Sequence, residues 1–247
     1  MVKIGLITMG QSPRVDILTD WKFDPREVEE YKAMDILVPP KDSQIPRNIE
    51  FIHLGALDDI PTERMNEIKP APGKSAIISR LRDGSWTLID HEKLKPLLRK
   101  CVERLEKAGC KAILQLCTGK FPYLKPRVPY IMPGILCKRL IESVLSPEGR
   151  LGILLPFPTK SGQEKPKRSP EWGQREIFSV NANPYEYPPE SITPAVEKMM
   201  KKDVEILYMG CLGYSFRHKE IASEILKIPV ILPRSVCART LAELYGF

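Results

Sequence analysis

Three segments of this chain recur in the same order, and the internal repeat constrains the fold more than any other feature of the sequence. The clearest copies are residues 129–139, PYIMPGILCKR, and residues 229–239, PVILPRSVCAR, which are identical at five of eleven positions. The other copies lie upstream and pair Ala112–Gly119 with Glu205–Gly213, and Lys3–Ile7 with Arg150–Leu154. The spacing between copies is too long for a solenoid. The sequence therefore predicts two pseudo-equivalent lobes.

Strand and helix patterns alternate along the chain, which is typical of parallel sheets covered by helices in an α/β fold. Residues 2–9 form a continuous apolar run that ends at Gly10, as expected of a strand buried on both faces. A helix is expected next, with Ser12 as its cap and Pro13 in its first position. Further strands are expected at 51–57, 75–81, 86–89, 112–116, 129–132, 151–155, 177–180, 205–209 and 230–232. Further helices are expected at 91–108, 133–145, 191–202, 216–226 and 233–244. We expect residues 1–133 plus 234–247 to form the first lobe and residues 134–233 the second.

The composition indicates a globular chain without a membrane segment. Hydrophobic residues make up 43% of the 247 residues and charged residues 28%, a balance typical of globular domains. A spanning helix needs roughly 18 consecutive apolar residues, and the longest apolar runs here have the length of strands. The short apolar run between Lys3 and Arg14 contains Gly5 and Gly10, and no small-residue cleavage site follows it. These features predict a cytoplasmic location.

The net charge of +7 raises the question of nucleic-acid binding. The densest basic run, Lys160–Arg168, lies in a stretch rich in Pro, Gly and Ser and is typical of a solvated loop. No zinc-finger spacing or RNP-like aromatic motif accompanies it. We therefore expect no nucleic-acid partner, and the charge is better suited to drawing small anions into a cleft.

Two cysteines hold equivalent positions in the repeat. Cys117 and Cys211 each follow an apolar strand, and each is followed two residues later by a glycine, Gly119 or Gly213. Ligands of open parallel sheets bind beyond the carboxyl ends of the strands. Two lobes that share one cleft would place one thiol on each side of a ligand.

The other four cysteines favour a structural interpretation. Buried cysteine usually behaves as a small hydrophobic residue, and we expect this of Cys101, Cys110, Cys137 and Cys237. The chain has no CxxC pair, so the sequence predicts no zinc or other metal site.

Three further segments resemble the AroM family. They are Gly10-Gln-Ser-Pro-Arg14, Leu81-Arg-Asp-Gly84, and Cys211-Leu-Gly-Tyr214 with Arg217-His218. The resemblance covers nearly the whole chain. That family is similar in fold to the aspartate/glutamate racemase superfamily.

The resemblance implies a two-cysteine chemistry. In the racemase superfamily each lobe contributes a cysteine that handles a substrate α-proton without a cofactor. Cys117-Thr118 resembles the first of these cysteine loops and Gly210-Cys211 the second. Glutamate racemase has Thr and His after its second cysteine, where this chain has Leu212, Gly213 and Tyr214, so the resemblance leaves the substrate open.

Substrate-binding groups are expected in the loops that follow the strands. A carboxylate that loses its α-proton gains charge, and backbone N–H groups can stabilise it. The candidate residues for this role are Gly10, Gln11, Ser12, Thr118, Gly119, Leu212 and Gly213. Arg14 is either a bidentate partner of a carboxylate or a solvated residue of the first helical turn. His218 either orients a thiol or ligand, or lies on the surface.

These inferences favour a cofactor-independent racemase, epimerase or isomerase that acts on a small carboxylate. The alternative is a binding or regulatory protein with the same cleft and no turnover. A homo-oligomer is left open. In the enzyme, the two sulfurs would sandwich one carbon at about 7 to 8 Å from each other, which is two near-attack separations with some slack.

Overall fold

The computed structural model describes residues 1–157, 167–168 and 170–246. Most of the basic run Lys160–Arg168 therefore lies outside the described residues. The chain divides into two compact units. Unit 1 comprises Met1–Pro133 and Cys237–Phe247, and unit 2 comprises Gly134–Val236.

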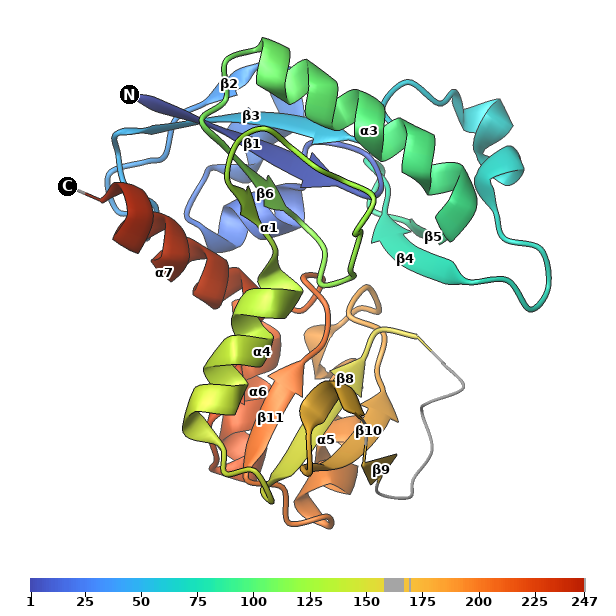
Figure 1. Cartoon of the computed structure of the whole chain (residues 1–247), viewed down its shortest axis with the longest axis vertical. Helices are drawn as coiled ribbons and strands as arrows, with labels where there is room; N and C mark the ends of the chain where they lie inside the picture. The colour runs from blue at the N-terminus through green and yellow to red at the C-terminus, as the bar shows by residue number, and fades with distance from the viewer. Residues whose placement is uncertain (158–166, 169, 247) are drawn as a thin grey trace. The chain divides into compact units, whose positions relative to one another are not determined.

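Unit 1 is built on a five-stranded sheet with the order β2-β3-β1-β6-β7 (Figure 1). Its four parallel strands are β1 (Val2–Thr8), β3 (Ile49–Gly55), β6 (Ala112–Gln115) and β7 (Tyr130–Ile131). The short edge strand β2 (Ile36–Leu37) runs antiparallel to β3.

Unit 2 repeats this topology with the order β9-β10-β8-β11-β12. Its parallel strands are β8 (Arg150–Leu155), β10 (Glu176–Asn181), β11 (Ile206–Met209) and β12 (Val230–Ile231), and β9 (Lys167–Arg168) is the antiparallel edge. The expected α/β fold with two helix-covered parallel sheets is confirmed.

The strand registers match the repeat in the sequence. Gly5 of β1 pairs with Ile113 of β6, and Gly152 of β8 pairs with Leu207 of β11. The glycines are the central residues of one repeated segment, and Ile113 and Leu207 belong to another. Each cysteine of the repeat follows its strand at the same interval, so both leave equivalent strands at the carboxyl edge.

Helices cover the sheet of unit 1 because each presents an apolar stripe to it. Helix α3 (His91–Lys107) is capped by Asp90, whose side chain accepts from the N–H groups of Glu92 and Lys93. Its buried leucines pack with Ile7, Ile52 and other residues of β1 and β3. Short helices α1 (Val15–Asp20) and α2 (Pro25–Glu30) lead to β2, and the 3-10 helix η1 (Thr62–Ile68) follows β3.

A β-hairpin of unit 1 precedes α3. It consists of β4 (Ala76–Arg80) and β5 (Trp86–Asp90), which pair antiparallel in a sheet of their own. The expected turn at Asp83-Gly84 is confirmed, because Asp83 Oδ1 accepts from Ser85 N–H at 2.9 Å and Gly84 takes a positive φ of 88°.

Both faces of the sheet of unit 2 are also covered. Helices α5 (Thr193–Met200) and α6 (Phe216–Leu226) pack on one face, and α4 (Pro133–Val144) packs on the other through Cys137 and Ile141. The short 3-10 helix η2 (Pro170–Trp172) precedes β10, and η3 (Pro189–Ile192) leads from β10 to α5. Helix α7 (Pro233–Tyr245) follows β12, and most of its residues belong to unit 1.

The first helix departs from the sequence prediction. It begins at Val15 with Arg14 as its N-cap residue, and no side chain caps it. Ser12 is not the cap, because its hydroxyl donates to Asp58 instead. Local spacing correctly predicted a helix here but could not reveal a partner 46 residues away.

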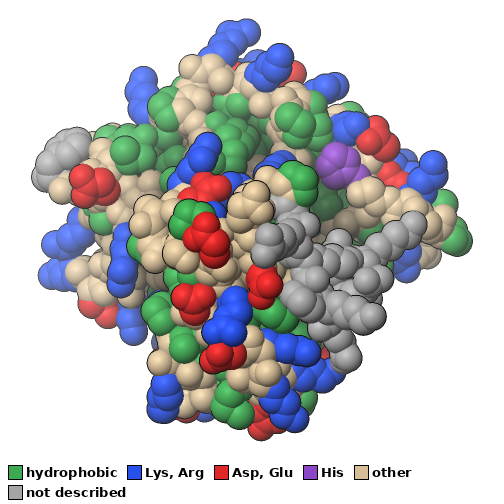
Figure 2. All heavy atoms as spheres, turned by 60° about the horizontal axis from the view of Figure 1, so that its bottom comes forward, with side chains coloured by type: hydrophobic (Ala, Val, Ile, Leu, Met, Phe, Trp, Pro, Cys, Tyr) green, Lys and Arg blue, Asp and Glu red, His purple; other side chains and the backbone are tan. Residues whose placement is uncertain are grey.

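Among the described residues, no helix is both long and apolar enough to cross a membrane. On the face drawn in Figure 2, Lys and Arg side chains are interspersed with Asp and Glu side chains. The two signs of charge are therefore mixed on this face.

Candidate active site

The Cys117 loop leaves the carboxyl end of β6 and is fastened by the side chain of Gln115. The Gln115 Nε2 atom donates to the carbonyl oxygens of Cys117, at 2.5 Å, and Gly119, at 2.7 Å. The Tyr130 hydroxyl of β7 donates to Gln115 Oε1 at 2.7 Å. The Gly119 N–H donates to the Cys117 sulfur at 3.3 Å. A donor directed at sulfur favours the thiolate over the thiol.

The Cys211 loop leaves the carboxyl end of β11 with the same sulfur geometry and a different fastening. The Gly213 N–H donates to Cys211 Sγ at 3.2 Å. Arg234, only 1% exposed, donates from Nε to the Leu212 carbonyl at 2.6 Å and from Nη2 to the Gly213 carbonyl at 2.9 Å. A buried cation therefore holds this loop, where a neutral amide holds the other.

The segment after Cys211 is tied down at several points. The Tyr214 hydroxyl donates to the Ala182 carbonyl at 2.6 Å. Ser215 caps α6 in a reciprocal arrangement with His218: Ser215 N–H donates to His218 Nδ1 at 2.9 Å, and His218 N–H donates to Ser215 Oγ at 3.4 Å. The two family-like residues Tyr214 and His218 thus have structural roles.

His218 is buried, so the surface interpretation of this residue is wrong. Its side chain is part of the α6 cap, and burial together with the nearby Arg234 charge lowers the pKa of His218 to about 4. Because Nδ1 accepts a hydrogen bond from Ser215 N–H, the neutral ring carries its proton on Nε2. Among the described residues, this buried Nε2 has no hydrogen-bond partner.

The exposure of the six cysteines separates them into two groups. Cys117 and Cys211 are partly exposed, whereas the other four are buried. Burial raises the thiol pKa to about 12 for Cys101, about 11 for Cys110 and about 12 for Cys137. Thiols with such pKa values carry almost no thiolate at neutral pH.

The Gly10 loop follows β1 at the same sheet edge as Cys117, and Asp58 holds it. Asp58 accepts from Ser12 N–H and Ser12 Oγ, both at 2.7 Å, and from Gly55 N–H at 2.7 Å. Burial raises the pKa of Asp58, and the hydrogen bonds from Ser12 and Gly55 oppose that rise. A Cβ on Gly55 would lie 2.6 Å from both Gly10 O and Ser12 N, so the close approach requires glycine.

Arg14 is buried and pairs bidentately with a carboxylate of this chain. Its Nε and Nη2 atoms donate to the two oxygens of Asp16, both at 2.8 Å. The Arg14 backbone N–H donates to Nδ1 of His53, which is 2% exposed, at 3.5 Å. The solvated interpretation of Arg14 is therefore wrong, and the bidentate partner is internal. Burial lowers the pKa of His53 to about 3, and the Arg14 charge adds to this effect.

The remaining candidate residues lie where the sequence predicts, in the loops after the strands. Thr118 and Gln11 are partly exposed, Gly10 is buried, and Leu212 is 1% exposed. Sequence reasoning missed Gln115, Arg234, Asp58 and Arg82. Two of them stand in segments that it did single out: Arg234 in the repeat copy at 229–239, and Arg82 in the Leu81–Gly84 motif.

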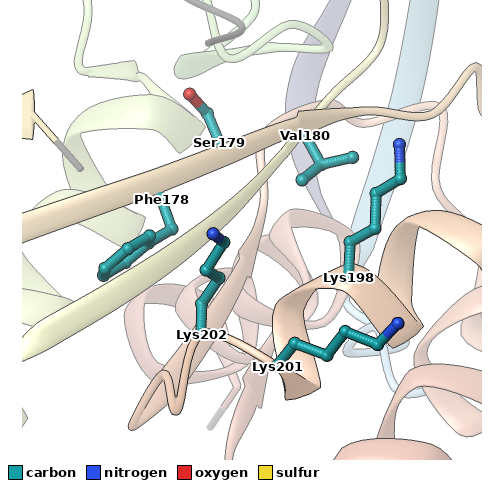
Figure 3. A pocket seen from close by; sticks show the side chains of 6 residues that line it. All are labelled: Phe178, Ser179, Val180, Lys198, Lys201 and Lys202. Atoms are coloured by element: carbon teal, nitrogen blue, oxygen red, sulfur yellow. The ribbon is translucent and has the colours of Figure 1, made fainter. Parts of the chain in front are cut away.

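A pocket of unit 2 lies away from these loops, between β10 and the end of α5. It has a volume of about 190 Å³ and is lined by Phe178, Ser179, Val180, Lys198, Lys201 and Lys202. Figure 3 shows Phe178 and Val180 on one side of the strand and Ser179 on the other. No residue predicted for the active site lines this pocket. The described part of the chain contains no group of three or more His, Cys, Asp or Glu placed to hold a metal ion.

The repeated topology, with a cysteine loop at the carboxyl edge of each sheet, defines a two-unit α/β protein with the fold of the Asp/Glu racemases. The family model described as AroM protein matches residues 4–245. The chain belongs to the AroM family. A search of curated protein sequences finds no significant match.

Solved structures share this fold at low sequence identity. Aspartate racemase from Picrophilus torridus is 16% identical with a TM-score of 0.56, and the match covers 100% of this chain and 95% of that chain. Allantoin racemase from Klebsiella pneumoniae is 11% identical with a TM-score of 0.55, over 100% and 88% of the two chains. Unliganded arylmalonate decarboxylase is 9% identical with a TM-score of 0.52, over 99% and 92%.

Proposed function

We propose that the protein is a cofactor-independent racemase, epimerase or isomerase that uses Cys117 and Cys211 as acid and base on a small carboxylate. The observation that carries the proposal is the match between the two cysteine loops. Each thiol follows an equivalent strand of the repeat, and each sulfur accepts the N–H of the glycine two residues later. The similar structures that are named racemases and a decarboxylase support this class of chemistry.

The proposed reaction moves one proton across a planar intermediate. The thiolate of one cysteine takes the α-proton, so the Cα–H bond breaks and its electron pair enters the carboxylate as an enediolate. The thiol of the other cysteine then donates its proton to the opposite face of Cα, and the electron pair forms the new Cα–H bond. The thiol and thiolate have exchanged places, and the stereocentre is inverted.

The polar groups of the loops have separate roles in this proposal. Backbone N–H groups of Thr118 and Leu212 would stabilise the charge of the enediolate. The N–H groups of Gly119 and Gly213 would stabilise the thiolate form of the cysteine two residues earlier. The Arg14 guanidinium pairs with Asp16, so a substrate carboxylate that bound Arg14 would have to compete with this pair. A productive thiol on one side only would suit decarboxylation, because protonation of an enediolate needs a single acid.

The test is solvent deuterium exchange. We expect the α-position of a true substrate to take up deuterium from ²H₂O, followed by NMR over a panel of amino acids, 2-hydroxy acids, maleate and shikimate-pathway acids. A panel member that stabilises the protein against heat but neither exchanges nor changes chemically would favour the alternative, a carboxylate-binding protein without turnover.

A further inference from the structure

A pocket on unit 1 remains outside the proposed thiol chemistry. It has a volume of about 360 Å³ and is lined by Gln11, Thr62, Met65, Leu81, Arg82 and Asp83. These residues come from the Gly10 loop, from η1 and from the turn of the β4–β5 hairpin. The pocket thus joins two of the segments that resemble the AroM family, Gly10–Arg14 and Leu81–Gly84.

The hairpin has no counterpart in the described part of unit 2. Between β10 and β11 the chain forms η3 and α5, whereas between β3 and β6 it forms η1, the hairpin and α3. A two-stranded hairpin has little stability of its own. Its packing is close, since a Cβ on Gly10 would lie 2.2 Å from the Arg80 carbonyl oxygen. An element added to one copy of the repeat and fixed to its Gly10 loop points to a role specific to unit 1.

The hairpin holds the Arg82 guanidinium in a defined orientation. Arg82 N–H donates to Gln11 Oε1 at 3.0 Å, and Arg82 Nε donates to the Ser12 carbonyl at 2.8 Å. Its Nη2 lies 3.5 Å from Asp58 Oδ1. The Nη1 group makes no hydrogen bond to any residue that the structure describes, and the side chain is 52% exposed. A guanidinium that is held through Nε and leaves Nη1 accessible can donate hydrogen bonds to an oxyanion.

The other lining residues indicate what accompanies the anionic group. Met65 and Leu81 supply apolar walls that pack against the core of unit 1. The Asp83 carboxylate is already engaged, because its Oδ1 accepts from Ser85 N–H and Ser85 Oγ, and the nearby Arg80 charge also acts on it. A carboxylate with an apolar body suits these walls better than an inorganic anion.

We propose that this pocket is a carboxylate-binding site in which Arg82 Nη1 pairs with the carboxylate and Met65 and Leu81 contact the apolar body of the ligand. The Arg82 fork needs no thiol, so the site is independent of Cys117 and Cys211. Binding therefore persists when both cysteines are replaced by serine.

The test measures benzoate binding to the full chain by titration calorimetry, with inorganic phosphate and benzyl alcohol as comparison probes. We expect benzoate to bind more tightly than either probe. Arg82→Gln should weaken benzoate binding at least about tenfold, since a charge-assisted hydrogen bond is lost. The matched control is Arg64→Gln in η1, because Arg64 is 58% exposed and pairs with Glu67. The Arg64→Gln variant should bind benzoate with the affinity of the wild type.

A second variant covers the case in which Arg82→Gln disturbs the Gly10 loop. Thr62 is exposed, and Thr62→Glu places a carboxylate in the pocket while Arg82 and Ser12 remain unchanged. This variant should therefore also weaken benzoate binding. The proposal is overturned if the wild type shows no saturable benzoate binding, if folded Arg82→Gln or Thr62→Glu binds as the wild type does, or if phosphate binds as tightly as benzoate. A wild-type protein that binds benzoate but exchanges deuterium into no panel member would count against the thiol chemistry alone.

Discussion

The two cysteine loops share their sulfur geometry and differ in the charge of the side chain that holds them. Gln115, a neutral amide supported by the Tyr130 hydroxyl, holds the Cys117 loop, whereas the buried guanidinium of Arg234 holds the Cys211 loop. Helix α6 begins five residues after Cys211, and its positive end adds to the difference. The hydrogen bond from a glycine N–H to the sulfur is therefore present in both units, whereas, among the described residues, a buried cation holds only the Cys211 loop. We expect the thiolate to reside on Cys211 in the resting protein.

The largest expected effect tests whether the loops share one function. Cys117→Ser and Cys211→Ser should each lower the rate of deuterium exchange at least about 100-fold, because general acid–base catalysis contributes about 10² to 10⁴. Ligand-induced thermal stabilisation should persist in both variants. Cys110→Ala is the matched control, since that cysteine is buried away from both loops. If only one of the two cysteine variants lost exchange, a single thiol would carry the chemistry.

The buried histidines extend the comparison to stability, with one in each unit. His218 has a folded pKa of about 4 and His53 of about 3, against about 6.5 in an unfolded chain. As the pH falls, each histidine takes up a proton in the unfolded state before it does so in the folded state. Its contribution to stability is therefore complete above about pH 6.5 and is lost as the pH falls toward the folded pKa.

For His218 alone the loss amounts to about 3 kcal/mol. Urea unfolding between pH 7 and pH 4 should therefore show a smaller loss in His218→Gln than in the wild type. His53→Gln makes the corresponding test in unit 1. Equal pH dependence in the wild type and both variants would contradict the burial of neutral histidines.

The charge difference between the loops should appear in thiol reactivity. Near pH 7, brief iodoacetamide treatment should label Cys211 faster than Cys117, since a guanidinium and a helix N-terminus near Cys211 favour its thiolate. Both should react faster than the four buried cysteines, as peptide mapping by mass spectrometry can measure. In Arg234→Met, labelling of Cys211 should fall towards the rate of Cys117. Equal rates of the two thiols in the wild type would remove the asymmetry.

The smallest expected effect concerns Gln115, the neutral side chain that holds the Cys117 loop. Gln115→Met removes two hydrogen bonds to the Cys117 loop without changing charge and should cost about 1 to 2 kcal/mol of unfolding free energy. The same substitution should leave the labelling rate of Cys211 unchanged. A change at Cys211 would mean that the two loops are coupled through the fold.

The repeat and the strand pattern predicted most of the fold because both depend on local sequence. Helix α6 has the bounds that the sequence predicted, Phe216–Leu226, since a serine cap precedes an apolar stripe. Short elements such as β2 and η1 were missed, because two residues of strand or a 3-10 turn have too little periodicity to recognise.

The candidate site was predictable only in part. The repeat identified Cys117 and Cys211, but the groups that fasten their loops act across long separations in the sequence. Arg234 reaches a carbonyl 22 residues away, and Asp58 reaches Ser12 over 46 residues. The burial of His218 and Arg14 also depends on tertiary packing, which is why the sequence left a surface position open for both residues.

The most direct test of the proposed chemistry is the distance between the two sulfurs in a crystal structure with a bound small carboxylate. The proposal predicts that Cys117 Sγ and Cys211 Sγ lie about 7 to 8 Å apart, on opposite sides of one ligand carbon. Sulfurs that face separate surfaces, or a ligand carbon that neither sulfur approaches, would contradict the two-thiol mechanism.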